Sequence, residues 1–303
     1  MRMTRRTLVQ AAAAGTTGAF LASNPAAAGV WNPPCGRRKI GLTPEEQAAP
    51  YARFMKPAVD PPQPHVPAAI AAGPTAASLI PSRRRLADDI HNPGYSTVET
   101  GYGQLPTGEV WVACLTDMPG VTPVMWEWWF AWHSRESGRY KLWHPEAHAY
   151  AALRTNRSER LPLREQFVSN TSYVDEIVGG HLDQLAITFR EPARFGIDTS
   201  RFDGVAICAT VGTAFVPVDI GMLCHQVRAT PTGSEMRSRF YLNVPGTRAY
   251  DPVGAACAFQ RGISLPRSVV FDRRFGAALL RHCGEEMNHL AGFLPELYWE
   301  FGG

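Results

Sequence analysis

The sequence of 303 residues lacks a strong charge of either sign. Its formal net charge is only +3, and Arg2, Arg5 and Arg6 belong to an amino-terminal segment that has no Asp or Glu before residue 29. Without that segment the chain is near neutral, so neither nucleic acid nor an anionic membrane is expected as a partner. Beyond the amino terminus, no segment is long and apolar enough to span a bilayer.

Closely spaced cysteine pairs are also absent. The six cysteines lie at positions 35, 114, 208, 224, 257 and 283, and none of them forms a Cys-X-X-Cys motif. Zinc sites built from thiolates depend on such spacing, so a cysteine-based zinc site is not expected. The spacing predicts no particular disulfide pairing.

The amino terminus has the features of an export signal. The pair Arg5-Arg6 precedes a weakly apolar run from Ala11 to Leu21 and then three alanines at positions 26–28. A positive start, a modest apolar run and a small-residue cleavage site are typical of a secretory signal, and the paired arginines resemble a twin-arginine signal. We therefore expect residues 1–28 to be a signal peptide and the protein to be exported, to the periplasm or the extracellular space. The alternative is a cytosolic chain with a disordered alanine-rich tail.

Residues 29–94 are rich in proline and alanine. Short helices are expected near residues 44–55 and 68–86, joined by extended proline-containing linkers. Since these pieces are too short for a core of their own, we interpret the segment as an arm that wraps around a larger domain.

Residues 95–303 are expected to form that domain, and with 45% hydrophobic residues the chain can bury one sizeable core. A helix rich in tryptophan is predicted at residues 124–133, an extended piece at 140–143 and a long final helix at about 270–290. Strands are predicted at residues 109–115, 167–176, 185–189, 205–211, 221–229 and 235–244. Consecutive strands without intervening helices indicate an antiparallel sheet and an α+β fold. A long carboxy-terminal helix within a curved sheet would be a helix-grip arrangement, with an apolar cavity between the two.

The pair His282 and Glu286 is the most informative feature of the final helix. Residues four apart lie on one face of a helix, and these two share that face with apolar residues at positions 275, 279, 290 and 293. A buried carboxylate needs a partner, and a cation is one remedy. Imidazole and carboxylate together suit zinc or a similar divalent metal. The alternative is a His–Glu hydrogen bond that fixes the helix.

Two strand positions are further candidates. Glu176 alternates with Val174 and Val178, which places it on the apolar face, although a carboxylate at a strand end in water is the alternative. His225 lies inward by the same alternation; it is either an ordinary core histidine or an acid/base and hydroxyl-binding group. Spacing alone does not choose among the histidines at positions 133, 144, 148 and 181.

Four blocks of sequence resemble the 2,4-diacetylphloroglucinol hydrolase and phloretin hydrolase family. They are residues 128–133, 139–145 and 237–240, and the terminal residues 282–295, in an order and at distances similar to the family's. The resemblance runs from about Tyr95 to the carboxy terminus. It implies a Bet v 1-like helix-grip fold, one zinc ion held by two histidines and two glutamates, and hydrolysis of the carbon–carbon bond between an acyl group and a polyhydroxylated aromatic ring.

The resemblance also implies roles for particular residues. The zinc ligands would be His148, Glu176, His282 and Glu286, with His144 and Glu165 as alternatives to the first two. The residues that contact substrate would be His225, Tyr140 and Tyr241, the last preferred to Phe240.

The expected function is therefore a zinc-dependent carbon–carbon hydrolase. Its expected partner is a small-molecule acylated phenol, and a homodimer is one option for its assembly. Two alternatives remain open: a carrier of hydrophobic aromatic ligands without catalysis, and a zinc esterase. Family members act inside the cell, whereas this chain has an export signal, so its native substrate is left open.

Overall fold

A computed structural model describes residues 35–263 and 271–302. The predicted signal peptide, residues 1–28, and the first residues of the arm lie outside the described residues. Within them, eight strands form one antiparallel sheet in the order β1-β2-β8-β7-β6-β5-β4-β3. The edge strands β1 and β3 do not pair with each other, so the sheet is open. The prediction of an α+β fold with an antiparallel sheet is confirmed.

The strands are mostly longer than predicted. Their bounds are β1 Gly101–Gln104, β2 Val110–Pro119, β3 His148–Leu153, β4 Thr171–Val178, β5 His181–Arg190, β6 Gly204–Thr213, β7 Val218–Thr230 and β8 Gly233–Thr247. Strands β1 and β3 were not predicted, because the first is rich in glycine and the second in alanine, and neither contains a β-branched residue.

The helices outside the arm are α5 Pro123–His133, α6 Ser137–Lys141, α7 Leu163–Phe167, α8 Pro252–Gln260, α9 Arg273–Ala291 and α10 Leu294–Phe301. The extended piece predicted at residues 140–143 is wrong, because the chain forms the short helix α6 there. The helical turn carries Tyr140 and Trp143 to the same side, three residues apart, and both side chains are buried.

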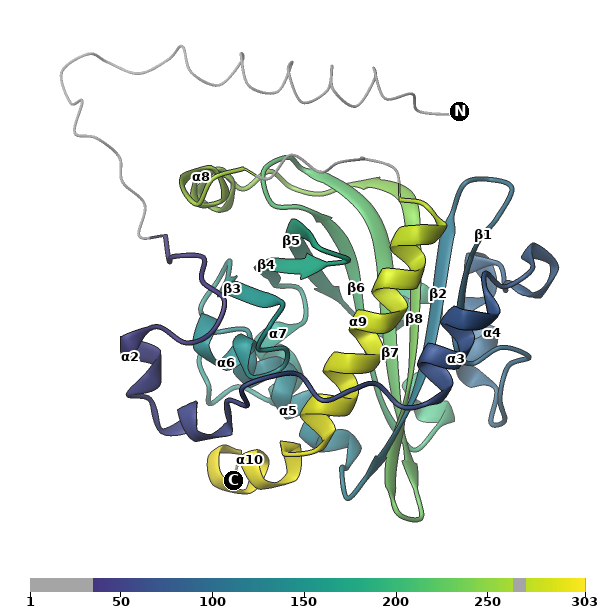
Figure 1. Cartoon of the computed structure of the whole chain (residues 1–303), viewed down its shortest axis with the longest axis horizontal. Coiled ribbons are helices and arrows are strands. Elements are labelled where there is room, and N and C mark those ends of the chain that lie inside the picture. Colours follow the sequence, from purple (N-terminus) through teal and green to yellow (C-terminus); the bar gives the residue numbers. More distant parts are fainter. Residues whose placement is uncertain (1–34, 264–270, 303) are drawn as a thin grey trace, which may run out of the picture.

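Helix α9 crosses the inner face of the curved sheet (Figure 1). Asp272 caps its amino terminus: the carboxylate accepts hydrogen bonds from the backbone N–H groups of Arg274 and Phe275 at 2.9 and 3.0 Å. Its buried face includes Leu279, Leu280, Cys283, Met287 and Leu290. The core of the molecule lies between this face, the sheet and the buried tryptophans of α5.

The arm consists of short pieces that contact the domain in several places. They are α2 Pro44–Gln47, η1 Pro50–Phe54, α3 His65–Ala72, η2 Ala77–Leu79, η3 Arg83–Arg85 and α4 Leu86–His91. A disulfide between Cys35 and Cys257 joins the start of the arm to α8. Helix α3 lies close to α9, since a Cβ added at Gly284 would lie 3.0 Å from Val66 Cγ2. The arm therefore supports α9 on the side away from the sheet.

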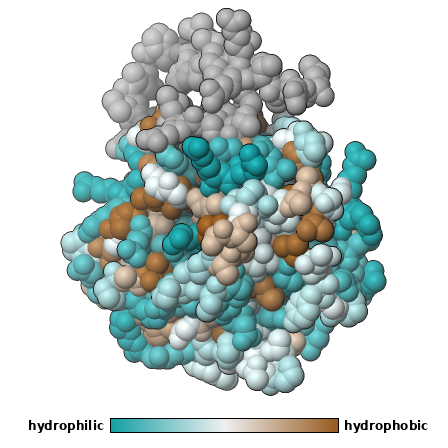
Figure 2. All heavy atoms as spheres, turned by 45° about the vertical axis from the view of Figure 1, so that its right-hand side comes forward, coloured by the Kyte–Doolittle hydropathy of each residue, from teal (hydrophilic) through white to brown (hydrophobic). Residues whose placement is uncertain are grey.

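The surface shows no obvious single apolar face in the view of Figure 2, where hydrophobic residues form separate patches between hydrophilic ones. Among the described residues, no helix is both long and apolar enough to cross a membrane.

A buried network of ion pairs fixes α4 to the outer face of the sheet. Arg237 and Arg239 of β8 are fully buried, and each contacts both Asp89 and Glu99 at 2.6 to 2.8 Å. Burial alone raises the pKa of Asp89 and of Glu99, but the two guanidinium groups outweigh it and bring both pKa values below their ordinary range. The network contains two guanidinium groups and two carboxylates, so its net charge is zero.

We expect Asp89→Ala to lower the free energy of unfolding by about 3–5 kcal/mol, because it leaves two buried guanidinium groups short of a partner. Denaturant unfolding measures this loss. The matched control is Asp88→Ala, one residue away, whose carboxylate is exposed and pairs with Arg85 at the surface; it should change stability by less than about 1 kcal/mol.

The same network predicts how stability depends on pH. Because the pKa values of Asp89 and Glu99 are lower in the folded than in the unfolded chain, their contribution is present above pH ~4 and is lost as the pH falls through the folded values. Equal losses from Asp89→Ala and Asp88→Ala, or an unaltered acid dependence in Asp89→Ala, would contradict this account.

Candidate active site

A cavity lies between the sheet and α9. Strands β4 to β8 and helix α9 form its walls, and residues of α5 and α6 line one part of it. Most lining side chains are aliphatic or aromatic. The polar lining residues are His133, Tyr140, Ser172, Glu176, Asp183, His225, His282 and Glu286.

Helix α9 contributes His282 and Glu286 to this cavity, as the sequence predicted from their spacing. Both side chains are buried. Their nearest atoms, His282 Nε2 and Glu286 Oε2, lie 3.7 Å apart, and the same Glu286 oxygen lies 3.4 Å from His148 Nε2. One carboxylate oxygen is thus shared between two imidazoles from different elements.

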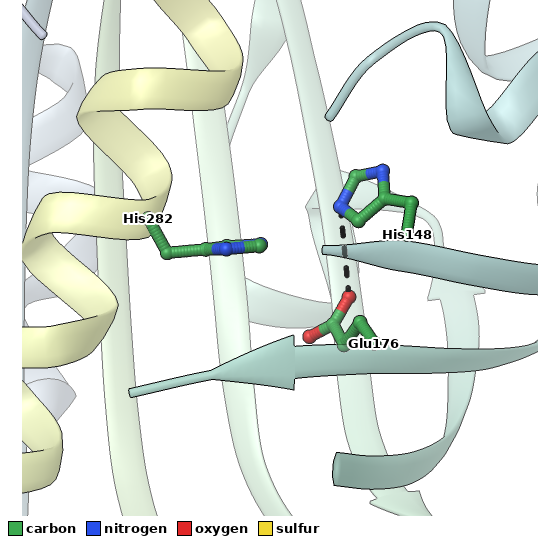
Figure 3. A group of neighbouring side chains, drawn as sticks. All are labelled: His148, Glu176 and His282. Carbon is green, nitrogen blue, oxygen red and sulfur yellow. Dashed lines mark ion pairs between the residues drawn. The ribbon is translucent and has the colours of Figure 1, made fainter. Parts of the chain in front are cut away.

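Strands β3 and β4 contribute His148 and Glu176, which stand opposite each other in the register. His148 Nε2 lies 4.0 Å from Glu176 Oε2. One ligand atom from each of His148, Glu176 and His282 lies within 4.8 Å of the other two, a group that could hold a metal ion. Figure 3 shows the two histidines and the glutamate pointing toward one another from the strands and from α9.

Tyr140 positions two members of this group. Its backbone carbonyl lies 3.1 Å from His148 Nδ1, its ring stacks on the His148 ring with centroids 3.9 Å apart, and its hydroxyl donates to Glu176 at 2.6 Å. Burial raises the pKa of Tyr140 well above its ordinary value, and the negative charge of Glu176 raises it further. The hydroxyl therefore stays protonated.

The arrangement of donor atoms fits a divalent ion. With Nδ1 directed at the Tyr140 carbonyl, His148 presents Nε2, which is buried and has no hydrogen-bond partner among the described residues. Ligand atoms in a tetrahedral zinc site lie about 3.4 Å apart, given bonds of ~2.0–2.1 Å. The distances of 3.4 and 3.7 Å between Glu286 and the two imidazoles are close to that value.

Protonation also favours metal binding. Burial lowers the pKa of His282 to about 3 and that of His148 well below its ordinary value, so both imidazoles are neutral at pH 7, the form that binds metal. Burial raises the pKa of Glu176 and of Glu286, because the surrounding protein does not provide enough positive charge or hydrogen bonds to offset the loss of water around each carboxylate. A bound cation would supply that positive charge.

The two alternative ligands, His144 and Glu165, are not members of this group. Glu165 is exposed on α7 and does not line the cavity. His144 is buried and stacks on His282 with centroids 4.9 Å apart, but its Nε2 lies 3.5 Å from Glu285 and it is not part of the group above.

His225 lies on β7 and lines the cavity. Its Nδ1 is 2.8 Å from Ser238 Oγ, which stands directly opposite on β8, and its ring contacts Phe130 and Phe240. Burial lowers its pKa to about 3, so the imidazole is neutral. The predicted inward direction of His225 agrees with the structure.

Tyr241 does not line the cavity, so its prediction as a pocket residue is wrong. Its hydroxyl donates to the Pro81 carbonyl at 3.3 Å, and its ring belongs to the cluster on the outer face of the sheet. Successive strand residues point to opposite faces, and the neighbouring Phe240 lines the cavity instead.

Asp183 is a lining residue that the sequence analysis missed. It stands opposite Glu176 in the β4–β5 register. Burial raises its pKa to about 7, with a further contribution from the charge of Glu176. The signal was available, because Asp183 alternates with Leu185, Ile187 and Phe189, but the strand predicted at 185–189 began after it.

Comparison with known proteins identifies the family. The family model described as "DAPG hydrolase PhiG domain" matches residues 80–299. This chain belongs to the 2,4-diacetylphloroglucinol hydrolase family. A 2,4-diacetylphloroglucinol hydrolase of Pseudomonas protegens is 32% identical over 275 residues, which cover 84% of this chain and 85% of that protein. A phloretin hydrolase of Eubacterium ramulus is 29% identical over 269 residues, covering 86% of this chain and 94% of that protein.

Two solved structures are distantly similar to this member of the diacetylphloroglucinol hydrolase family. A crystal structure of a Mycobacterium smegmatis protein has a TM-score of 0.34 and 11% identity, covering 65% of this chain and 98% of that chain.

We expect the purified protein to contain about one divalent ion per chain and Glu286→Ala to lose most of it, because Glu286 reaches both imidazoles. Elemental analysis of the dialysed protein measures the content. The matched control is Glu285→Ala, the neighbouring glutamate on α9, which should keep its metal. Wild-type metal content in Glu286→Ala would remove Glu286 from the ligand set.

Proposed function

We propose that this protein is a zinc-dependent hydrolase that cleaves the carbon–carbon bond between an acyl group and a polyhydroxylated aromatic ring. The observation that carries the proposal is the group of His148, Glu176 and His282, with Glu286 within 3.4 and 3.7 Å of the two imidazoles, beside a largely apolar cavity. The names of the relatives, hydrolases of 2,4-diacetylphloroglucinol and of phloretin, support the class of substrate.

Each part of the site has a role in this proposal. His148, Glu176, His282 and Glu286 would hold the ion. A bound zinc ion supplies Lewis acidity at a carbonyl oxygen and makes water a better nucleophile at neutral pH. The apolar and aromatic wall binds the flat ring and excludes bulk water.

The ring carbon that leaves must receive a proton, and the cavity contains a group suited to handle it. His225 is neutral, so its ring carries both a donor and an acceptor nitrogen. Ser238 Oγ forms a hydrogen bond with Nδ1, which leaves Nε2 available to a molecule that enters the cavity. We assign His225 to hydrogen bonding with a ring hydroxyl and to proton transfer. Tyr140, whose hydroxyl donates to Glu176, retains lone pairs that can accept from a second hydroxyl.

The fold and location are part of the same proposal. The position of α9 on the inner face of an antiparallel sheet supports a Bet v 1-like helix-grip domain over residues 95–303, with residues 29–94 as its arm. The disulfide between Cys35 and Cys257 supports export, because disulfides persist in oxidising compartments.

The substrate class is tested with three compounds in one assay: phloretin, 2,4-diacetylphloroglucinol and a simple aryl ester. We expect metal-dependent release of the free phenol and the carboxylic acid from at least one of the two ketones. Hydrolysis of the ester alone would favour an esterase. Tight binding of the ketones without turnover would favour a carrier.

We expect His225→Ala to keep its metal but to turn over substrate at least ~10²-fold more slowly, the scale of a lost general acid/base. Steady-state kinetics and elemental analysis on the same preparation measure both quantities. His65→Ala, an exposed histidine of α3, is the control. Unchanged turnover in His225→Ala would show that His225 is an ordinary core histidine with no role in catalysis.

A further inference from the structure

Asp183 lines the cavity but has no role in the proposed reaction. Asp183 is half-buried as a residue, but its Oδ2 atom is buried and has no hydrogen-bond partner among the described residues. Buried carboxyl groups are nearly always paired, since an unpaired one costs several kcal/mol. A buried acceptor that faces a cavity gains its partner when a ligand with a hydroxyl group enters.

The location of Asp183 specifies which hydroxyl group it meets. Asp183 stands opposite Glu176 in the β4–β5 register, and both side chains line the cavity. Side chains at such positions have Cβ atoms about 4.5–5.5 Å apart. Glu176 belongs to the group that would hold the ion beside the acyl carbonyl. A ligand group next to that carbonyl is therefore close to Asp183.

Two more polar atoms of the cavity lining lack partners among the described residues. They are Trp143 Nε1, a donor, and Ser172 Oγ, which can donate or accept. Ser172 lies on the same face of β4 as Glu176, four residues away. Unpaired polar atoms at separate points of an apolar wall match a flat molecule with several hydroxyl groups around its ring.

We propose that Asp183 accepts a hydrogen bond from the ring hydroxyl ortho to the acyl group, and so selects ortho-hydroxylated acylphenols. The inference rests on the proposed function, because it takes the acyl carbonyl to lie at the His/Glu group. Of the three unpartnered groups, Asp183 is the one that stands opposite Glu176, beside the position taken for the acyl carbonyl. A ligand that lacks the hydroxyl leaves Oδ2 of Asp183 without a partner.

The test compares two probes, 2,4-dihydroxyacetophenone, which has the ortho hydroxyl, and 4-hydroxyacetophenone, which lacks it. Their dissociation constants are measured on the metal-loaded protein by titration calorimetry, so that the readout does not depend on turnover. We expect the wild type to bind the ortho-hydroxylated probe about 10- to 100-fold more tightly. Asp183→Leu, which is similar in size but cannot accept, should reduce that ratio to near one.

Two further variants complete the design. Asp183→Asn keeps the shape and one acceptor oxygen, and should retain a smaller preference, several-fold below that of the wild type; it decides the question if Asp183→Leu fails to fold. Asp117→Asn, an exposed aspartate of β2 outside the site, should keep the full preference. All variants should keep the wild-type metal content, since Asp183 is not in the group of candidate ligands.

The outcomes separate this inference from the proposed function. A wild-type preference that persists unchanged in both Asp183 variants overturns the role of Asp183 and leaves the hydrolase proposal intact. Failure of the wild type to bind or to hydrolyse any acylphenone overturns both. Loss of metal from Asp183→Leu would show that this residue acts through the ion and would also overturn the proposal.

Discussion

The site depends on four ionisable side chains, three of them buried and Glu176 half-buried, that meet where α9 approaches strands β3 and β4. Two imidazoles and two carboxylates meet there in an apolar setting, and burial works against the charged form of each. Without a cation the carboxylates lack sufficient compensation, and His148 Nε2 has no partner among the described residues. A divalent ion would pair with the carboxylates and would also bind His148 Nε2. We therefore expect metal binding to stabilise the packing of α9 against strands β3 and β4.

The sheet and the arm together hold α9, the helix that carries His282 and Glu286. The sheet supports α9 on one side, and the arm supports it on the other, where α3 approaches Gly284 and the Asp60 backbone N–H donates to His289 at 3.0 Å. The arm is in turn held to the sheet by the buried pairs of Arg237 and Arg239 and to α8 by the disulfide. Small shifts of α9 would separate ligands that come from different elements, so this bracing has a direct consequence for the site.

Local periodicity predicted part of the site, and the errors came from a residue carried over from the family resemblance and from a strand bound. The spacing of His282 and Glu286 placed both on the buried face, and alternation placed Glu176 and His225 inward. Tyr241 was assigned to the wrong face, because a choice between neighbours on a strand is a choice between opposite sides of the sheet. Asp183 was missed for a related reason: the strand was expected to begin two residues after it.

The sequence by itself determined the antiparallel α+β class, the position of the long terminal helix and the face on which each of its polar residues lies. These follow from hydrogen-bonding geometry that repeats every two or 3.6 residues, so they can be recognised within a short segment. His148 has no periodic signal of its own and was named only through the family resemblance; the tertiary structure places it beside Glu286, and it alone places Asp183 beside Glu176. Contacts between distant segments are set by strand register and by the packing of whole faces, which no short stretch of sequence contains.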